Sequence, residues 1–346
     1  MQNVKLENAA KRPRSRRAVM TALVLSLALG MGLAGDIVAA KAEGVSKGKK
    51  VALLMTGTSL PWPAGVKSAF LERAQTYGMD VTNFDQMYDT ARQVQQVDDA
   101  IARKFDLIAV MPVSEQAILP ALLRAKRANV PVVIVNSPPK DGSDEYFQTF
   151  IGEDAVEMGK LSAESMLQAL KDAGRDGGKI ALITGSLQEG VAPRRLAGIK
   201  QVLAAHPNVQ IVAVEDVHWD PVQTERVTGQ LLARFAPQGG LDIIYGMNDD
   251  QTVAIVHAAE AANVPLGLKP GQVIVIGGNC SVQGFDLIKA GKQYSTGVQG
   301  PSRTGSGAAD LVNDYFEGKP LKKYNYLPVE TITKANIAKW EKICTY

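Results

Sequence analysis

The stretch Asp242-Ile243-Ile244-Tyr245-Gly246-Met247-Asn248-Asp249-Asp250 decides the fold of this chain. Its apolar half predicts a buried strand, which ends abruptly in an amide and two carboxylates. An apolar pattern from Val253 to Ala259 follows at once and predicts a helix. In an open α/β sheet, ligands bind just beyond the carboxyl ends of the strands. We therefore expect Asn248 and Asp249 either to contact a ligand or to cap the helix.

The same alternation of strand, loop and helix extends outward from this stretch in both directions. We expect strands at 51–55, 79–84, 107–111, 132–135, 179–184, 210–214, 272–276 and 294–299. We expect helices at 64–77, 90–104, 115–128, 155–173, 193–205, 223–235, 282–290 and 303–316, with an extended segment and a short helix in the tail. Strands that alternate with helices form βαβ units, and hence parallel sheets. Because the pattern restarts near residue 150 in a chain of 346 residues, it predicts an α/β protein with two doubly wound parallel-sheet lobes.

Residues 1–42 predict a signal peptide that is removed on export. A basic segment, Lys11 to Arg17, precedes an apolar run from Ala18 to Leu33 and small-residue cleavage sites up to Ala42. The apolar run contains glycines and is followed by Asp36, so an uncleaved membrane anchor is the weaker alternative. The sequence does not decide between export by the general secretory route and export by the twin-arginine route. The predicted location is the periplasm.

The formal net charge of +3 belongs to this leader. Residues 1–42 carry seven Lys or Arg and two acidic residues, which leaves about −2 for the remaining chain. The basic balance of the whole chain therefore indicates no surface for nucleic acid.

Motifs for catalysis and cofactors are missing from the sequence. It has no Gly-x-Gly-x-x-Gly after the first strand, no phosphate-binding loop and no Gly-x-Ser-x-Gly. His206, His218 and His257 have no carboxylate or Cys at metal-ligand spacing. Asp249 and Asp250 are adjacent carboxylates at a strand–helix junction, where capping is the commoner role. We expect no enzyme, no metal and no cofactor.

The residues that follow the strands form an aromatic and amide set instead. They are Thr58, Ser59, Trp62, Asn136, Ser137, Ser186, His218, Trp219, Asn248, Asp249, Asn279 and Gln299. Aromatic faces suit the C–H faces of a sugar, and amides offer donors and acceptors to hydroxyls. Each residue alone would serve as a cap or turn residue, but their coincidence at successive strand ends favours a pocket for a small polyhydroxylated ligand.

Cys280 and Cys344 are the two cysteines of the chain. An oxidising compartment would permit a disulfide between them, and two unpaired thiols remain an equal alternative.

Three motifs carry a resemblance to a known family: Tyr245-Gly246-Met247-Asn248-Asp249, Ile276-Gly277-Gly278-Asn279 and Gly297-Val298-Gln299. With the order of the elements, they resemble periplasmic sugar-binding proteins of the ribose-binding type, the solute receptors of ABC transporters. The resemblance covers essentially all of the chain after the leader. It implies a type I periplasmic binding protein fold, a monomer, ligand binding by domain closure and a membrane permease as partner.

The resemblance also implies where the lobes begin and end. The three crossover segments would lie near 151–154, 299–302 and 326–330. Lobe 1 would then comprise 49–152 plus 301–328, and lobe 2 would comprise 153–300 plus 329–346.

The family's binding positions fall on particular residues of this sequence. Its two cleft aromatics match Trp62 and Trp219, its cleft Asn matches Asn248, and its hinge Gln matches Gln299. The family's binding Arg falls on Pro193, so Arg194 is the candidate to replace it, while Arg195 matches a structural Arg.

Two departures bear on specificity. Asn136-Ser137 stands where ribose-type receptors have Asp-Arg, and Asn279 stands where they have Asp. Because charged partners make the stronger hydrogen bonds, a neutral amide-rich pocket favours another monosaccharide, a polyol or a cyclitol over ribose.

Three other functions would use a similar fold. A periplasmic sensor that feeds a kinase or chemoreceptor is the main alternative, and the sequence does not separate it from transport. A repressor core would need an N-terminal helix-turn-helix, where this chain has its leader. A hydrolase or isomerase would need the catalytic residues that the sequence lacks.

Overall fold

The computed structural model describes residues 44–344 and Tyr346. The predicted signal peptide, up to Ala42, lies outside the described residues. None of the helices formed by residues 44–344 is long and apolar enough to cross a membrane.

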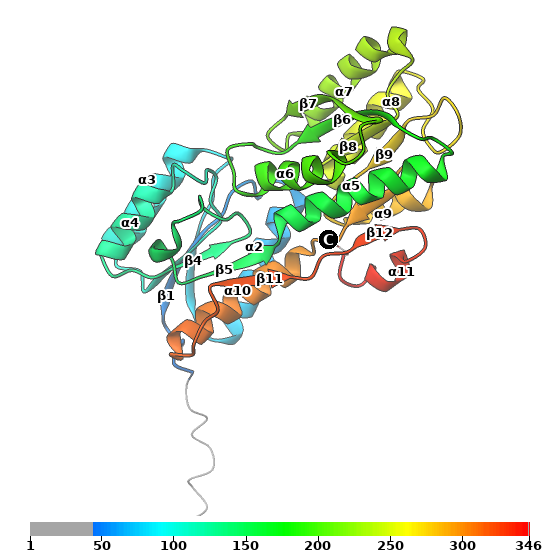
Figure 1. The fold of residues 1–346 in the computed structure, drawn as a ribbon. Coiled ribbons are helices and arrows are strands. Elements are labelled where there is room, and N and C mark those ends of the chain that lie inside the picture. The colour runs from blue at the N-terminus through cyan, green and yellow to red at the C-terminus, as the bar shows by residue number, and fades with distance from the viewer. Residues whose placement is uncertain (1–43, 345) are drawn as a thin grey trace, which may run out of the picture. The chain divides into compact units, whose positions relative to one another are not determined.

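Two six-stranded sheets form the framework of the described chain (Figure 1). The first sheet has the strand order β11-β5-β4-β3-β1-β2, and neighbouring strands in it run parallel. Its strands are β1 (Lys50–Leu54), β2 (Asp80–Phe84), β3 (Leu107–Val110), β4 (Val132–Val135), β5 (Thr149–Glu153) and β11 (Tyr324–Leu327). We call this sheet and the helices packed on it lobe 1.

The second sheet repeats the arrangement, with the order β12-β10-β9-β8-β6-β7. Only β12 is antiparallel to its neighbour, and the other strands run parallel. Its strands are β6 (Gly178–Thr184), β7 (Val209–Asp216), β8 (Ile243–Gly246), β9 (Ile274–Ile276), β10 (Ser295–Gly297) and β12 (Thr331–Thr333). This sheet and its helices form lobe 2, so the predicted α/β fold with two parallel-sheet lobes is confirmed.

Helices cover both faces of each sheet, because the strand residues are apolar on both faces. Helices α2 (Pro61–Thr76) and α10 (Pro301–Phe316) pack on one face of the lobe 1 sheet, and α3 (Thr90–Ala102) and α4 (Leu119–Arg127) pack on the other. In lobe 2 the corresponding pairs are α5 (Ala155–Asp172) with α6 (Val191–Leu203), and α7 (Pro221–Phe235) with α8 (Asp249–Ala261). Two shorter helices, α9 (Val282–Lys289) and α11 (Ile337–Trp340), lie near the end of the chain.

Polar residues at the strand ends also start the helices. Asp154 and Asp220 accept hydrogen bonds from backbone amides of α5 and α7, and Ser281 does the same for α9. Helix α2 starts at Pro61, three residues before the predicted start, because proline is well tolerated in the first turn of a helix.

The chain passes between the two lobes three times, after β5, after β10 and after β11. These passages coincide with the predicted crossover segments. Every strand of each sheet begins inside the ranges predicted for its lobe, although β5 extends one residue beyond, to Glu153. The limits 49–152 plus 301–328 and 153–300 plus 329–346 remain a proposal.

A disulfide joins Cys280 to Cys344, with the two Cα atoms 5.2 Å apart. It lies in a small apolar cluster with Phe285, Ile332 and Trp340. The sequence left this pairing open. The bond ties the loop after β9 to the segment after α11.

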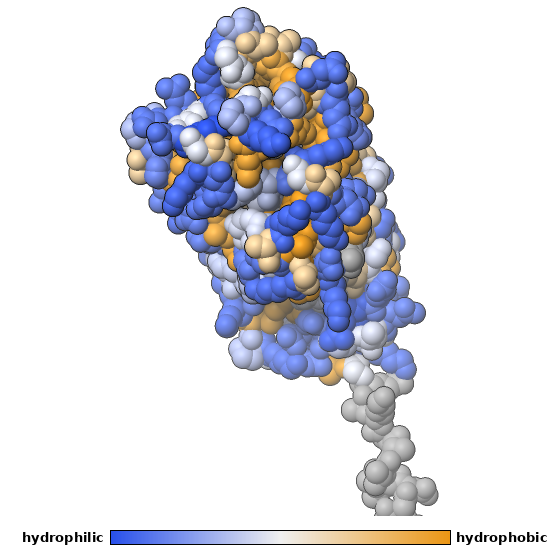
Figure 2. All heavy atoms as spheres, turned by 90° about the vertical axis from the view of Figure 1, so that its right-hand side faces the viewer, coloured by the Kyte–Doolittle hydropathy of each residue, from blue (hydrophilic) through white to orange (hydrophobic). Residues whose placement is uncertain are grey.

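The outer surface is mainly hydrophilic, and smaller apolar areas lie between the polar side chains on the face shown in Figure 2. Within residues 44–344, few large apolar side chains are exposed, and they lie apart in the sequence; examples are Met87, Val222 and Tyr326. The apolar residues of the inner strands β1, β3, β4, β6, β8 and β9 are instead buried inside the two lobes.

Candidate functional site

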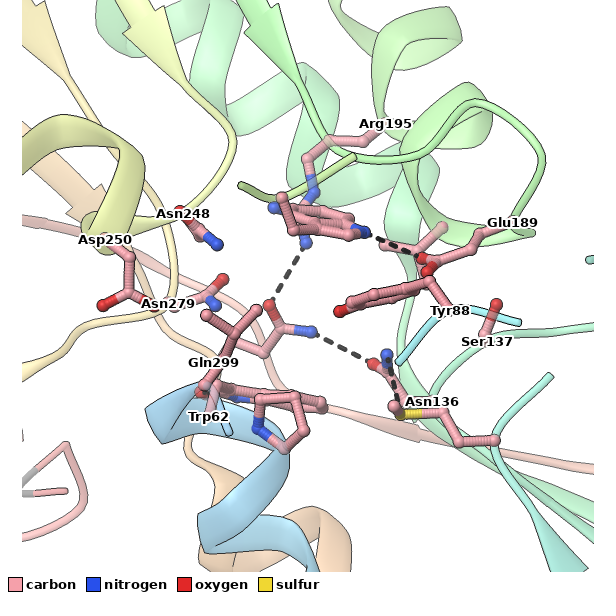
Figure 3. A pocket seen from close by; sticks show the side chains of 15 residues that line it. Trp62, Tyr88, Asn136, Ser137, Glu189, Arg195, Asn248, Asp250, Asn279 and Gln299 are labelled. Carbon is pink, nitrogen blue, oxygen red and sulfur yellow. Dashed lines mark hydrogen bonds between the residues drawn. The ribbon is translucent and has the colours of Figure 1, made fainter. Parts of the chain in front are cut away.

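A cavity of about 500 Å³, part of it open to solvent, lies between the carboxyl ends of the strands of both lobes. Figure 3 shows the side chains that line it. They are Leu60, Trp62, Pro63, Tyr88, Met111, Asn136, Ser137, Glu189, Val191, Arg195, Trp219, Asn248, Asp250, Asn279 and Gln299. Its position at the strand ends is the usual place for a ligand in an α/β fold.

Contacts across the rim join the two lobes around this cavity. The Gly190 amide of lobe 2 donates to the Ser137 hydroxyl of lobe 1 over 3.2 Å, and the Glu115 amide donates to the Gln188 carbonyl over 3.0 Å. A side chain at Gly190 would clash, since its Cβ would lie 1.9 Å from the Pro138 carbonyl oxygen. The lobes are therefore in close contact at this edge.

Trp62 of lobe 1 lies at the start of α2 and is buried. Its indole Nε1 donates to the Gln299 carbonyl over 2.8 Å, which fixes the ring beside the crossover after β10. The ring thus presents a fixed apolar face to the cavity (Figure 3).

Trp219 of lobe 2 follows β7 and is held from two sides. Its Nε1 donates to Glu189 Oε2 over 3.2 Å. Its ring lies directly against the backbone of Gly185, where an added Cβ would come within 1.9 Å of the indole. Gly185 and Glu189 therefore position this aromatic side chain.

Gln299 links the two lobes through its side chain amide. Its Oε1 accepts from Arg195 Nη2 over 3.2 Å, and its Nε2 donates to Asn136 Oδ1 over 3.2 Å and to Glu153 Oε2 over 3.3 Å. The guanidinium of Arg195 also donates to the Met247 carbonyl over 2.5 Å. A network of hydrogen bonds thus runs from the end of β4, through the crossover, to the end of β8 (Figure 3).

Asn248 and Asp249 divide the two roles expected of them. The Asn248 side chain accepts from the Gln251 amide over 2.7 Å and caps α8, while it also lines the cavity. Asp249 instead points into lobe 2, where it accepts from the Ser281 amide, from Thr296 Oγ1 and from Gln293 Nε2. Asp250 takes its place on the cavity wall.

Burial changes the protonation of several acidic groups at the site. Removal from water raises the pKa of Glu189 to about 8 and raises the pKa values of Glu153 and Asp249 to about 7. Burial also raises the pKa of Asp250. Of these four acids, Glu189 and Asp250 line the cavity, and at neutral pH burial keeps Glu189 largely protonated.

Seven of the eleven predicted ligand-binding residues line the cavity: Trp62, Asn136, Ser137, Trp219, Asn248, Asn279 and Gln299. Their role in binding remains a prediction. Thr58 and Ser59 do not line the cavity; Ser59 is exposed and bonds Met87 Sδ over 3.2 Å.

Arg194 also lies away from the cavity. It donates to Glu115 Oε2 over 2.9 Å, to Asp141 Oδ1 over 2.7 Å and to the Pro139 carbonyl over 3.3 Å, all in lobe 1. Its neighbour Arg195 faces the cavity, because adjacent residues of a helix point to different sides. Arg194 thus does not line this cavity, and its expected role in place of the family's binding Arg stays a prediction.

The sequence alone did not indicate eight of the lining residues: Leu60, Pro63, Tyr88, Met111, Glu189, Val191, Arg195 and Asp250. Tyr88 stands four residues beyond the end of β2, whereas Asn136 directly follows β4, so the folded loop after β2 is needed to bring Tyr88 to the site. Glu189 stands five residues beyond β6 and needs the folded loop to bring it to the site.

No group of His, Cys, Asp and Glu within residues 44–344 could hold a metal ion. The polar groups of the site are those of a binding pocket, with aromatic faces, amides and carboxyls.

Comparison with known proteins agrees with this geometry. The model of a periplasmic binding protein domain matches residues 51–320. The ribose import binding protein of Haemophilus influenzae is 24% identical over 88% of this chain and 95% of its own length. A putative rhizopine-binding protein of Rhizobium meliloti is 27% identical over 76% of this chain and 83% of its own length.

One similar solved structure is the periplasmic binding protein component of the arabinose ABC transporter from Shewanella sp. ANA-3. Its superposition on this chain has a TM-score of 0.77, at 25% sequence identity. The match covers 85% of this chain and 95% of that protein. The resemblance in sequence motifs is thereby confirmed, and the related proteins bind solutes and are not enzymes. This chain belongs to the periplasmic binding protein family.

Proposed function

We propose that the protein is the solute receptor of an ABC importer and binds a monosaccharide, polyol or cyclitol between its lobes. The observation that carries the proposal is the cavity, which both lobes line with tryptophan rings and side-chain amides. Amides offer paired donors and acceptors to hydroxyl groups, and aromatic faces cover C–H groups.

Each residue has a distinct task in this proposal. Trp62 and Trp219 contact the apolar faces of the ligand, while Asn136, Asn248 and Asn279 bond its hydroxyls. Gln299 lies at a crossover and already joins residues of both lobes. Rotation at the three crossovers would open the cavity, and binding would favour the closed arrangement.

The names of relatives support this class of ligand. The curated relatives include a D-allose-binding protein of Escherichia coli and a xylitol-binding protein of Mycolicibacterium smegmatis, and one similar fold was solved with bound myo-inositol. The neutral pair Asn136-Ser137 favours a ligand other than ribose.

The protein would act in the periplasm after its signal peptide is removed. Its partner would be a membrane permease that contacts both lobes when the ligand is bound. The protein is proposed to work as a monomer.

A thermal-shift screen of the chain without residues 1–42, against sugars, polyols and cyclitols, tests the proposal. A ligand at a hundredfold excess over its dissociation constant stabilises the folded protein by about 2.7 kcal/mol. Trp219→Ala should abolish the shift while circular dichroism shows an intact fold. A screen in which no hydroxylated compound raises the melting temperature would refute the proposed class of ligand.

A further inference from the structure

Two acceptors on one side of the cavity have no donor in the protein. The Asp250 carboxylate lines the cavity and makes no side-chain hydrogen bond or ion pair with a residue in the described part of the chain. Asn279 is 92% buried and lines the same cavity, and its Oδ1 has no hydrogen-bond partner among these residues. Figure 3 shows both residues on the side of the cavity that α8 and the loop after β9 form.

These acceptors need a donor that the ligand brings. The Asn279 Oδ1 atom is buried, and leaving a buried acceptor unpaired destabilises the folded protein, whereas Asp250 is only partly buried. Burial raises the pKa of Asp250, whereas its place in the first turn of α8 favours the ionised form, and a positively charged ligand group would favour that form further. The bound ligand is therefore expected to place both charge and hydrogen-bond donors at this end.

The cations of the site are already engaged elsewhere. Arg195 is the one guanidinium among the lining residues of the described chain; its Nη atoms donate to the Met247 carbonyl, to Gln299 Oε1 and to Met158 Sδ, and its Nε has no partner among the described residues. Glu189 adds a second carboxyl on the opposite side of the cavity (Figure 3). Because burial raises the pKa of Glu189 to about 8, this carboxyl is largely protonated at neutral pH, and Asp250 is the carboxylate of the lining to which Arg195 does not donate.

The number of donor hydrogens separates two kinds of ligand. A hydroxyl has one hydrogen to donate, so a neutral polyol would need two neighbouring hydroxyls to satisfy both acceptors, and these would leave the charge of Asp250 without a counter-charge. A protonated primary amine has three, so it could bond both, and its charge would offset Asp250. The Asn248 amide and the Tyr88 hydroxyl, which also line the cavity, remain for the hydroxyls of the same ligand.

We propose that the ligand is a polyol that carries a protonated primary amine, such as an amino sugar or an aminocyclitol, and that Asp250 and Asn279 bind its ammonium group. The inference rests on the proposed function, since it specifies the ligand class of that same cavity.

Matched pairs of compounds test the inference in the wild-type chain without residues 1–42. Isothermal titration calorimetry at neutral pH would compare glucosamine with glucose, galactosamine with galactose, and an inosamine with the corresponding inositol. We expect the amine to bind at least tenfold more tightly than its hydroxyl counterpart in at least one pair. Equal or tighter binding of the hydroxyl member in every pair that binds would overturn the inference.

Two variants assign the selectivity to a residue. Asp250→Asn keeps the shape of the side chain and removes its charge, and we expect it to lower the ratio of amine to hydroxyl affinity at least tenfold. Glu157→Gln is the matched control, because Glu157 is an acidic residue in the first turn of α5, exposed and outside the cavity lining. An unchanged ratio in Asp250→Asn would overturn the role of Asp250, whereas a lowered ratio in both variants would indicate a general effect of charge.

The failure of this inference is distinguishable from failure of the proposed function. If neutral sugars, polyols or cyclitols bind and amines gain nothing, the receptor function stands and the amine preference is wrong. If neither member of any pair binds and the wider screen finds no hydroxylated ligand, both are wrong. The comparison in wild-type protein remains decisive even if a variant does not fold.

Discussion

Arg194 connects the two lobes, and its removal should weaken ligand binding without harming either lobe. Its guanidinium reaches from α6 to Glu115 and Asp141 of lobe 1 at 2.9 and 2.7 Å. These bonds exist only while the lobes are in contact. Because ligand binding and closure are coupled in the proposed mechanism, Arg194→Ala should shift the equilibrium toward the open form and raise the dissociation constant.

The size of the effect follows from the exposure of the partners. The Arg194 and Glu115 side chains are 21% and 25% exposed, so their bond should contribute more than a surface pair, for which 0–1 kcal/mol is typical. The Asp141 side chain is 93% exposed and should add little. We expect a loss of about 1–2 kcal/mol, which corresponds to a dissociation constant raised about 5- to 30-fold.

The assay is a titration of tryptophan fluorescence with a ligand found in the thermal-shift screen, since Trp62 and Trp219 line the cavity. Arg124→Ala is the matched control: its guanidinium makes two bonds to Asp98, at 2.7 and 2.9 Å, inside lobe 1. It should lower stability slightly and leave affinity unchanged. An affinity of Arg194→Ala within twofold of wild type, or an equal loss in both variants, would refute the reasoning.

Two further predictions concern Trp219 and its partner Glu189. Gly185→Ala should displace the Trp219 indole and weaken ligand binding, because the added Cβ would lie 1.9 Å from the ring. The control Gly229→Ala in α7, where a Cβ would have nothing within 4 Å, should be neutral or stabilising. Fluorescence titration and thermal melts compare the two variants, and normal binding by Gly185→Ala would contradict the packing described for Trp219. In the folded state the pKa of Glu189 is about 8, whereas in the unfolded state it is about 4.3. Between these pH values the folded state holds a proton that the unfolded state has lost. The free energy of unfolding should therefore fall as the pH rises from about 4 to 8. Urea unfolding of the unliganded protein should show this, and Glu189→Gln should reduce the slope by up to about 1.4 kcal/mol per pH unit; an unchanged slope would count against a buried proton on Glu189.

The sequence was sufficient for the fold because the apolar strands are continuous and regularly spaced. The segments 132–135 and 282–290 agree with β4 and α9 to within a residue. The strand β5 was taken for a crossover alone, since its residues, such as Gly152 and Glu153, lack the apolar run of the other strands. Its pairing with β11, from the far end of the chain, depends on tertiary structure.

Site residues were predictable where they follow a strand closely. They were not predictable where the conformation of a loop or helix decides whether the side chain faces the cavity. Asn136, Asn248 and Asn279 reach the cavity because the backbone places them at the strand ends. Local sequence could not decide between Arg194 and Arg195, or between Asp249 and Asp250. In each pair the neighbours differ by about 100° around a helix, and only the packed structure fixes which one faces the ligand.

The left-handed backbone at two of these positions limits how the pocket can evolve. Asn136 and Asn279 have φ angles of 61° and 85°, which few residues other than Gly, Asn and Asp adopt at low cost. A change from Asn to Asp would alter the charge presented to a ligand and keep the same backbone. Variants selected for new specificities should therefore interchange amide and carboxylate here, and gain bulk at neighbours such as Val191 or Ser137.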